Sequence, residues 1–260
     1  MAAISRDELK MESEAVSNIL KKEFAIGQII GKSEAVRELH KKIEQISPCN
    51  INVLISGESG TGKELVARAI HYLSLRAGKP FIPVNCCAIP EHLFESELFG
   101  HEKGAFTGAC DNHNGLVKEA EGGTLFLDEI GTISPNVQAK LLRLLQDKEY
   151  KPLGCPKPKN ADIRIIAATN KDLYTLVREG TFREDLYYRL NILAIYLPPL
   201  RERRDDIPQL ISHFINKYSR EYNKPEIELS QALINEFAAY KWPGNIRELE
   251  NKIQQMIVLP

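Results

Sequence analysis

A glycine-rich segment at residues 57–64 has the composition of a phosphate-binding loop, here called the P-loop. It comprises Gly57, Glu58, Ser59, Gly60, Thr61, Gly62, Lys63 and Glu64. A strand-like run at 52–56 precedes it and an amphipathic helical pattern at 64–75 follows it, which is the setting such a loop requires. The glycines let successive backbone N–H groups turn inward around phosphate oxygens, and the helix N-terminus adds partial positive charge. Lys63 is therefore predicted to contact the β- and γ-phosphates of a bound nucleotide.

Two consecutive carboxylates, Asp128 and Glu129, follow an apolar strand-like run at 124–127. Such a pair is more often a solvated strand end, but the P-loop lysine 65 residues upstream favours a catalytic role. Asp128 is predicted to hold Mg²⁺, directly or through water, and Glu129 to polarise the attacking water. Glu64 stands where Ser or Thr usually contacts the metal, so the candidate Mg²⁺ ligands are Asp128 and Glu64. Asn170 could orient the water or sense the γ-phosphate, although by itself it would more often be a turn residue.

Parallel strands are needed to bring these residues together. Strand-like runs occur at 52–56, 81–84, 124–127, 163–168 and 193–197. Helical patterns alternate with them, which predicts an α/β fold with a parallel sheet and helices on both faces. After Pro198 and Pro199 only helical patterns remain. The predicted organisation is a linker at 1–25, an α/β nucleotide-binding subdomain at 26–198 and a small helical subdomain at 199–260.

Helix starts in the last subdomain carry recognisable capping residues. Asp205 and Asp206 are predicted to cap its first helix, and Ser230 its second. Pro243, Gly244 and Asn245 are predicted to begin its third helix.

Composition excludes several other classes of protein. The 260 residues are 43% hydrophobic and 27% charged, with 34 Lys+Arg and 35 Asp+Glu for a formal charge of −1, as in soluble globular proteins. This near-zero charge gives no excess of basic residues of the kind that indicates a nucleic-acid partner. No apolar run approaches the roughly 18 residues that a membrane span needs, and the N-terminus has no secretory signal. The five cysteines and six histidines show no metal-ligand spacing, so we expect reduced cysteines in a cytosolic protein.

Three further segments carry a family resemblance. They are Glu97–Ala109, which contains the letters GAFTGA; Phe182–Asn191, which leads into Leu197–Arg203; and Trp242–Leu249. With GESGTGKE and GGTLFLDE, the sequence resembles the central AAA+ domain of bacterial NtrC-like enhancer-binding activators of sigma-54 RNA polymerase. The resemblance covers roughly residues 26–260, and GAFTGA is highly specific to this group. The family also has glutamate at the position of Glu64.

The resemblance assigns a contact role to one loop, here called the GAFTGA loop. It comprises Gly104, Ala105, Phe106, Thr107, Gly108 and Ala109. It is similar to the loop that grips the sigma factor, with Phe106 and Thr107 as contact residues. Without the resemblance, Phe106 could also be a buried loop anchor. Asn85 matches the residue that restrains the catalytic glutamate and couples the nucleotide state to this loop.

The resemblance also implies that subunits act on one another. Arg183 and Arg189 match arginine fingers, which reach the nucleotide of a neighbouring subunit, although helix-surface ion pairs are the alternative. A ring is therefore implied, expected to be a hexamer, with a heptamer as the alternative. Arg247 matches a second sensor that touches nucleotide in its own subunit. The adenine pocket would be lined by the segment that contains Ile29, Ile30 and Gly31.

The resemblance therefore implies an ATPase, with ATP and Mg²⁺ as cofactors, that remodels the sigma-54 holoenzyme in the bacterial cytoplasm to allow open-complex formation. One alternative is another AAA+ remodelling ATPase that does not act on sigma-54. Another is an ATP-binding transcriptional regulator that does not hydrolyse. Such activators usually carry an N-terminal regulatory domain and a C-terminal helix-turn-helix. We therefore expect this chain to be a fragment, with DNA contacted only through a domain outside it and no contact with a membrane.

Overall fold

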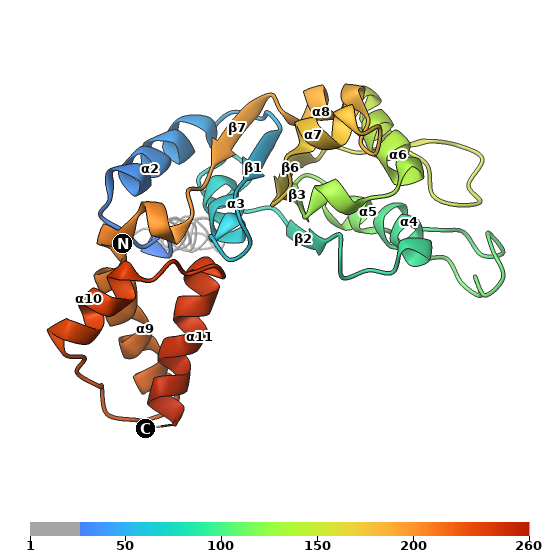
Figure 1. Ribbon diagram of the computed structural model, residues 1–260. Helices are drawn as coiled ribbons and strands as arrows, with labels where there is room; N and C mark the ends of the chain where they lie inside the picture. The colour runs from blue at the N-terminus through green and yellow to red at the C-terminus, as the bar shows by residue number, and fades with distance from the viewer. Residues whose placement is uncertain (1–26, 260) are drawn as a thin grey trace, which may run out of the picture.

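A five-stranded parallel sheet lies at the centre of the α/β subdomain in the computed structural model, which describes residues 27–259 (Figure 1). Its strands are β1 (Val53–Ser56), β2 (Phe81–Asn85), β3 (Thr124–Asp128), β6 (Arg164–Thr169) and β7 (Leu193–Tyr196). They lie in the order β2-β3-β6-β1-β7, and each neighbouring pair is parallel. The five predicted strands are confirmed to within one residue at each end. The predicted linker at 1–25 lies outside the described residues.

Helices cover both faces of this sheet because its strands are apolar on both sides. One face packs against α2 (Glu34–Ile46) and α3 (Lys63–Tyr72) through alternate residues such as Val53, Ile55 and Ile166. The opposite face packs against α4 (Glu91–Phe99), α5 (Leu116–Glu119), α6 (Pro135–Asp147), α7 (Leu173–Arg178) and α8 (Glu184–Leu190). The predicted fold class is confirmed.

The chain then forms a separate helical subdomain with its own apolar core. Two short 3-10 turns, η2 (Leu200–Glu202) and η3 (Arg204–Asp206), lead into α9 (Ile207–Glu221), α10 (Gln231–Ala239) and α11 (Asn245–Val258). Its core includes Leu210, Phe214, Trp242, Leu249 and Ile253. The hydroxyl of Ser230 accepts a hydrogen bond from Leu233 N, which confirms the predicted cap of α10.

The predicted side-chain cap of α9 by Asp206 is wrong. Asp206 is fully buried, and its carboxylate accepts hydrogen bonds from Lys32 N, Ser33 N and Ser33 Oγ instead. These donors lie at the start of α2, so the carboxylate ties the two subdomains together. The helix predicted at 64–75 is also shorter than expected, because α3 ends at Tyr72 and Leu75 is 89% exposed.

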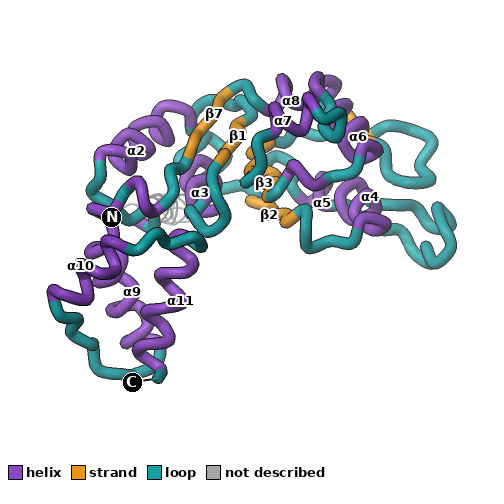
Figure 2. The backbone as a smooth tube through the Cα atoms, in the orientation of Figure 1, coloured by secondary structure: helices purple, strands orange, loops and turns teal. Residues whose placement is uncertain are grey.

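Two loops project from the end of the α/β subdomain that lies away from α9–α11 (Figures 1 and 2). One joins α4 to α5 and contains the GAFTGA loop; the other joins β4 (Glu149–Tyr150) to β5 (Lys159–Asn160). They are held together at their bases, where Leu153 N donates to Gly100 O and Glu102 N donates to Leu153 O, both at 2.9 Å. Among residues 27–259, no helix is both long and apolar enough to cross a bilayer.

Candidate functional site

A cleft of about 550 Å³ lies where the α/β subdomain meets the helical subdomain. Twelve of the predicted site residues line it: Ile29, Ile30, Ser59, Gly60, Thr61, Gly62, Lys63, Glu64, Asn85, Asp128, Glu129 and Arg247. They come from the segment that precedes α2, the P-loop and the start of α3, the ends of β2 and β3, and α11. The parallel sheet causes this convergence, because the carboxyl ends of its strands share one edge.

Lys63 begins α3 and is held at the base of the cleft. Its side chain is 6% exposed, and Nζ donates to Gly57 O at 3.0 Å and Glu58 O at 3.2 Å. The same Nζ lies 3.7 Å from Glu129 Oε1. The ammonium group therefore lies between the P-loop backbone and a carboxylate, with backbone acceptors that phosphate oxygens can replace.

The two carboxylates at the end of β3 have different environments. Asp128 Oδ1 accepts from Glu129 N at 3.0 Å, and burial together with the neighbouring Glu129 charge raises the pKa of Asp128. Glu129 has φ 56, in the left-handed region that non-glycine residues rarely adopt. Its Oε2 accepts from Asn170 N at 3.1 Å. The left-handed turn after β3 thus sets the directions of these two adjacent side chains. The backbone amide of Asn170 binds the carboxylate of Glu129.

Two of the predicted residues have other partners in this structure. Asn85 Oδ1 accepts from Cys87 N at 2.9 Å, and within residues 27–259 no hydrogen bond joins Asn85 to Glu129. The carboxylate of Glu64 is bound by Arg68 Nε at 2.9 Å and Nη2 at 2.7 Å. The predicted role of Asn85 is to restrain Glu129, and that of Glu64 is to bind Mg²⁺. Both roles stay predictions.

Three predicted nucleotide-binding residues lie outside the cleft lining. Gly57 is buried, and its carbonyl accepts from Lys63. Gly31 packs against the helical subdomain, since a Cβ there would lie 2.7 Å from Asp206 Cγ. Glu58 forms a bidentate ion pair with Arg201, at 2.7 and 2.8 Å, which lowers the pKa of its carboxyl to about 2.

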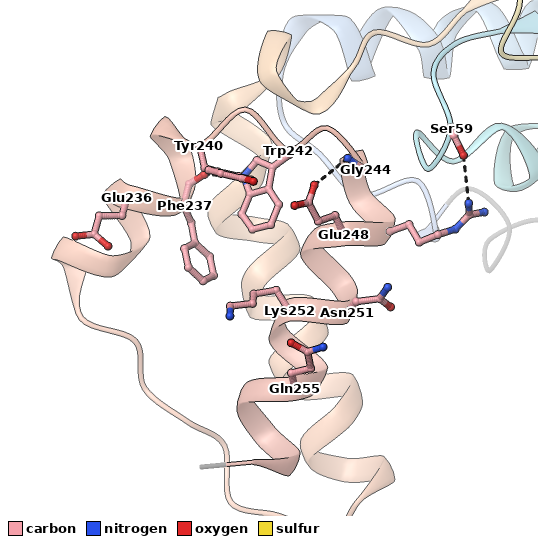
Figure 3. Close-up of a pocket in the computed structure, with 11 residues that line it drawn as sticks. Ser59, Glu236, Phe237, Tyr240, Trp242, Gly244, Glu248, Asn251, Lys252 and Gln255 are labelled. Carbon is pink, nitrogen blue, oxygen red and sulfur yellow. Dashed lines mark hydrogen bonds between the residues drawn. The ribbon is translucent and has the colours of Figure 1, made fainter.

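Arg247 reaches from α11 toward the P-loop, as its predicted sensor role requires. Its Nη1 donates to Ser59 Oγ at 3.3 Å. Figure 3 shows this bond as the dashed line that ends on Ser59, beside a second pocket of about 660 Å³. That second pocket lies mainly over α10 and α11 and is lined by aromatic side chains, among them Phe237, Tyr240 and Trp242.

Comparison with known proteins decides the family. The sigma-54 interaction domain family matches residues 29–196, and the AAA+ ATPase lid domain family matches residues 201–260. The chain belongs to the sigma-54 interaction domain family. Its helical subdomain is thus an AAA+ lid, and its α/β subdomain is the sigma-54 interaction domain proper.

Relatives of this sigma-54 interaction domain protein are regulators of transcription and nitrogen fixation. It is 51% identical to the regulatory protein AtoC of Escherichia coli over 99% of this chain and 56% of AtoC. It is 49% identical to the nitrogen fixation protein AnfA of Azotobacter vinelandii over 98% of this chain and 48% of AnfA. The chain therefore spans about half the length of these curated relatives. A crystal structure of NtrX from Brucella abortus in complex with ADP matches with a TM-score of 0.85 and 36% identity, over 98% of this chain and 57% of that one.

The GAFTGA loop of this sigma-54 interaction domain is a surface feature. Phe106 is 39% exposed, and its ring meets His101 edge-on at 5.0 Å between centroids. Thr107 is exposed, whereas Ala109 is buried at the base of the loop. The alternative of a buried Phe106 anchor is therefore disfavoured.

The two candidate arginine fingers lie away from the cleft of their own chain. Arg183 pairs with Asp185, with Nη2 at 2.7 Å from Oδ2, and Arg189 is exposed on α8. Neither lines the cleft. This surface placement is compatible with action on the nucleotide of a neighbouring subunit, which stays a prediction.

Sequence reasoning missed several residues of the helical subdomain that reach the cleft or the P-loop. Arg203, His213, Lys217 and Glu250 line the cleft, while Arg201 and Asn245 bind the P-loop residue Glu58. A signal existed for some of them, because Arg201, Arg203 and Asn245 lie inside the segments that carry the family resemblance. Their long-range partners could not be read from spacing.

Proposed function

We propose that this chain is the ATP-hydrolysing motor of a bacterial cytoplasmic activator that remodels sigma-54 RNA polymerase holoenzyme for open-complex formation. The observation that carries the proposal is a separation of two surfaces. Lys63, Asp128 and Glu129 meet in the interdomain cleft, whereas Phe106 is exposed on a loop at the opposite end of the α/β subdomain. Chemistry at one end could therefore drive a contact at the other.

ATP hydrolysis assigns distinct tasks to the cleft residues. The P-loop amides and Lys63 would hold the phosphates, and Ile29 and Ile30 would contact the base. Glu129, held by Asn170 N, would accept hydrogen bonding from water and orient it toward the γ-phosphate. Arg247 would contact phosphate from α11, since it already reaches Ser59.

The donor set of the cleft fits Mg²⁺ that enters with ATP. Asp128 and Glu64 line the cleft and offer carboxylate oxygens, which are the ligands that this hard cation prefers. Mg²⁺ would neutralise phosphate charge as it develops. Glu64 would first have to leave Arg68, so Asp128 is the stronger of the two candidates.

Self-association completes the proposed site. Arg183 and Arg189 lie on the surface outside their own cleft, so only a neighbouring subunit can receive them as fingers. A closed ring of identical interfaces, a hexamer or heptamer, would supply every cleft with a finger. Contact with DNA is proposed to come from a helix-turn-helix outside this chain.

The deciding experiment measures sigma-54 binding in each nucleotide state. Native gels or sedimentation would follow this chain with purified sigma-54 under ADP, a non-hydrolysable ATP analogue and a transition-state analogue. We expect binding with ATP-like and transition-state analogues and little with ADP, because only a differential interaction with the two states can drive remodelling. Thr107→Ala should lose binding while it retains ATP turnover. Equal sigma-54 binding in all states, or full binding by Thr107→Ala, would contradict the proposed mechanism.

Two substitutions in the cleft separate binding from chemistry. Lys63→Ala removes a phosphate contact and should abolish ATP binding, whereas Glu129→Gln should keep ATP bound and stop its turnover. Wild-type turnover by Glu129→Gln would show that another group activates the water. Turnover without any binding to sigma-54 would favour a remodelling ATPase with a different client.

A further inference from the structure

Three consecutive carbonyl oxygens of the P-loop accept hydrogen bonds from the helical subdomain. Ser59 O accepts from Asn245 Nδ2 at 3.0 Å, and Gly60 O accepts from Ile246 N at 3.0 Å. Thr61 O accepts from Arg203 Nη2, also at 3.0 Å. The donors are a side-chain amide, a backbone amide at the start of α11, and the guanidinium of Arg203, a residue that is 3% exposed.

Planar peptide groups make these bonds relevant to phosphate binding. In a trans peptide the C=O of one residue points opposite to the N–H of the next, and the group rotates as a unit. The bonds to Ser59 O, Gly60 O and Thr61 O therefore fix the directions of the N–H groups of Gly60, Thr61 and Gly62. Those amides belong to the loop that is to surround the phosphates.

Asn245 is held in the geometry that this contact requires. It is fully buried, with φ 54, and its Oδ1 accepts from Leu200 N at 2.8 Å. Its Nδ2 donates to Ser59 O and to Glu58 Oε2, so both amide protons are used. Glu58 is in turn paired with Arg201, so the side chains form one connected network.

Close packing of the main chain at Gly60 also keeps the P-loop from shifting relative to α11. A Cβ at Gly60 would lie 2.3 Å from Gly244 O, in the residue just before α11. The P-loop and the α11 N-terminus therefore touch through main chain as well as through hydrogen bonds.

We propose that Asn245 and Arg203 are positioning residues that preset the phosphate-binding amides of the P-loop from the helical subdomain. Nucleotide affinity then depends on the orientation of that subdomain, because a rotation of α11 turns the P-loop peptides. The inference rests on the proposed function, since it assumes that the cleft binds a nucleotide.

The test compares two amide-to-carboxylate substitutions on α11. Asn245→Asp keeps the size and the acceptor for Leu200 N, but it loses the donor to Ser59 O and places a negative charge beside Glu58. Gln254→Glu controls for an added negative charge on the same helix, at a half-buried position that does not contact the P-loop, and it loses only a bond to Tyr222 OH. Calorimetric titration with ADP should show about tenfold or greater weakening for Asn245→Asp and less than about twofold for Gln254→Glu.

ATP turnover tests the positioning role, because a general loss of structure would not raise KM while leaving kcat nearly unchanged. Lys63, Asp128 and Glu129 are unchanged, so Asn245→Asp should raise KM for ATP by about the same factor while kcat falls less than about threefold. The single tryptophan, Trp242, is buried three residues before Asn245, and its emission should shift in Asn245→Asp without nucleotide. If Asn245→Asp does not fold, Arg203→Gln tests the bond to Thr61 O in the same assays.

The outcomes separate this inference from the proposed function. Wild-type chain that binds no ADP would overturn both. Wild-type binding together with equal ADP affinity in Asn245→Asp and Gln254→Glu would overturn the inference alone. A fall in kcat with no change in KM would also overturn it, since preset amides act on binding.

Discussion

Gly60→Ala should destabilise the chain even without nucleotide, because this glycine is required on two grounds. Its φ is +78, where a side chain costs about 1–2 kcal/mol. The added Cβ would also lie 2.3 Å from Gly244 O and 3.1 Å from Arg247 Cβ, so main chain must shift. That shift breaks the bond from Ile246 N to Gly60 O, worth about 1 kcal/mol net. The expected loss is about 2–3 kcal/mol.

Gly180→Ala isolates the contact from the backbone strain. Gly180 has φ +72, and nothing lies within 4 Å of its added Cβ, so only the cost of about 1–2 kcal/mol remains. Thermal unfolding followed by circular dichroism measures both variants. At about 2–4 °C per kcal/mol for a chain of this size, Gly60→Ala should melt roughly 4–12 °C below wild type. Its loss should exceed that of Gly180→Ala by about 2–4 °C. Equal losses would refute the claim that the P-loop is packed against α11.

Further predictions concern the chemistry and the loop. Arg189→Ala should lower ATP turnover by about 10³–10⁵-fold, and mixing it with Lys63→Ala subunits should restore some turnover; failure of the mixture at ring-forming concentrations would count against trans action. Burial and the neighbouring Glu129 charge raise the pKa of Asp128. This carboxylate is therefore protonated at a higher pH than an ordinary aspartate. The acidic limb of a kcat/KM profile at limiting Mg²⁺ should therefore lie above the usual range for an aspartate, and a limb within or below that range would contradict this. Phe106→Ala should lower the melting temperature by only about 1–6 °C, since its ring is partly exposed and one aromatic contact is worth about 0.5–1.5 kcal/mol. Its binding to sigma-54 should nevertheless be lost in the native-gel assay.

The sheet could be predicted from sequence because its strands are nearly uniform in hydrophobicity. Every residue of β6 is buried, including Arg164, which donates to the backbone of residues 46, 47 and 51. Such runs, bounded by polar residues, are visible in a single sequence. The convergence of Lys63, Asp128 and Glu129 followed from the parallel arrangement of the strands.

The polar contacts between the subdomains could not be predicted in this way. Asp206 looked like a helix cap, yet it binds residues 173 and 174 positions away. Glu58 looked like part of the phosphate cradle, yet its partner Arg201 is 143 positions away. Local spacing carries no information about such pairs, since a carboxylate satisfies either role equally well. Asn245 was recognised only as a helix start, although its side chain reaches the P-loop.

The dependence of the P-loop on α11 has a consequence for synthesis on the ribosome. β1 lies between β6 and β7, so neither of its sheet neighbours exists when the P-loop leaves the exit tunnel. Asn245, which holds Ser59 O, follows 186 residues later. At about 5–20 residues per second, those residues take roughly 10–40 s to make. During that interval the nascent chain carries the complete P-loop sequence without the groups that shape it. The affinity of the P-loop for nucleotide should therefore reach its full value only after α11 has emerged, because the donor to Ser59 O is missing until then.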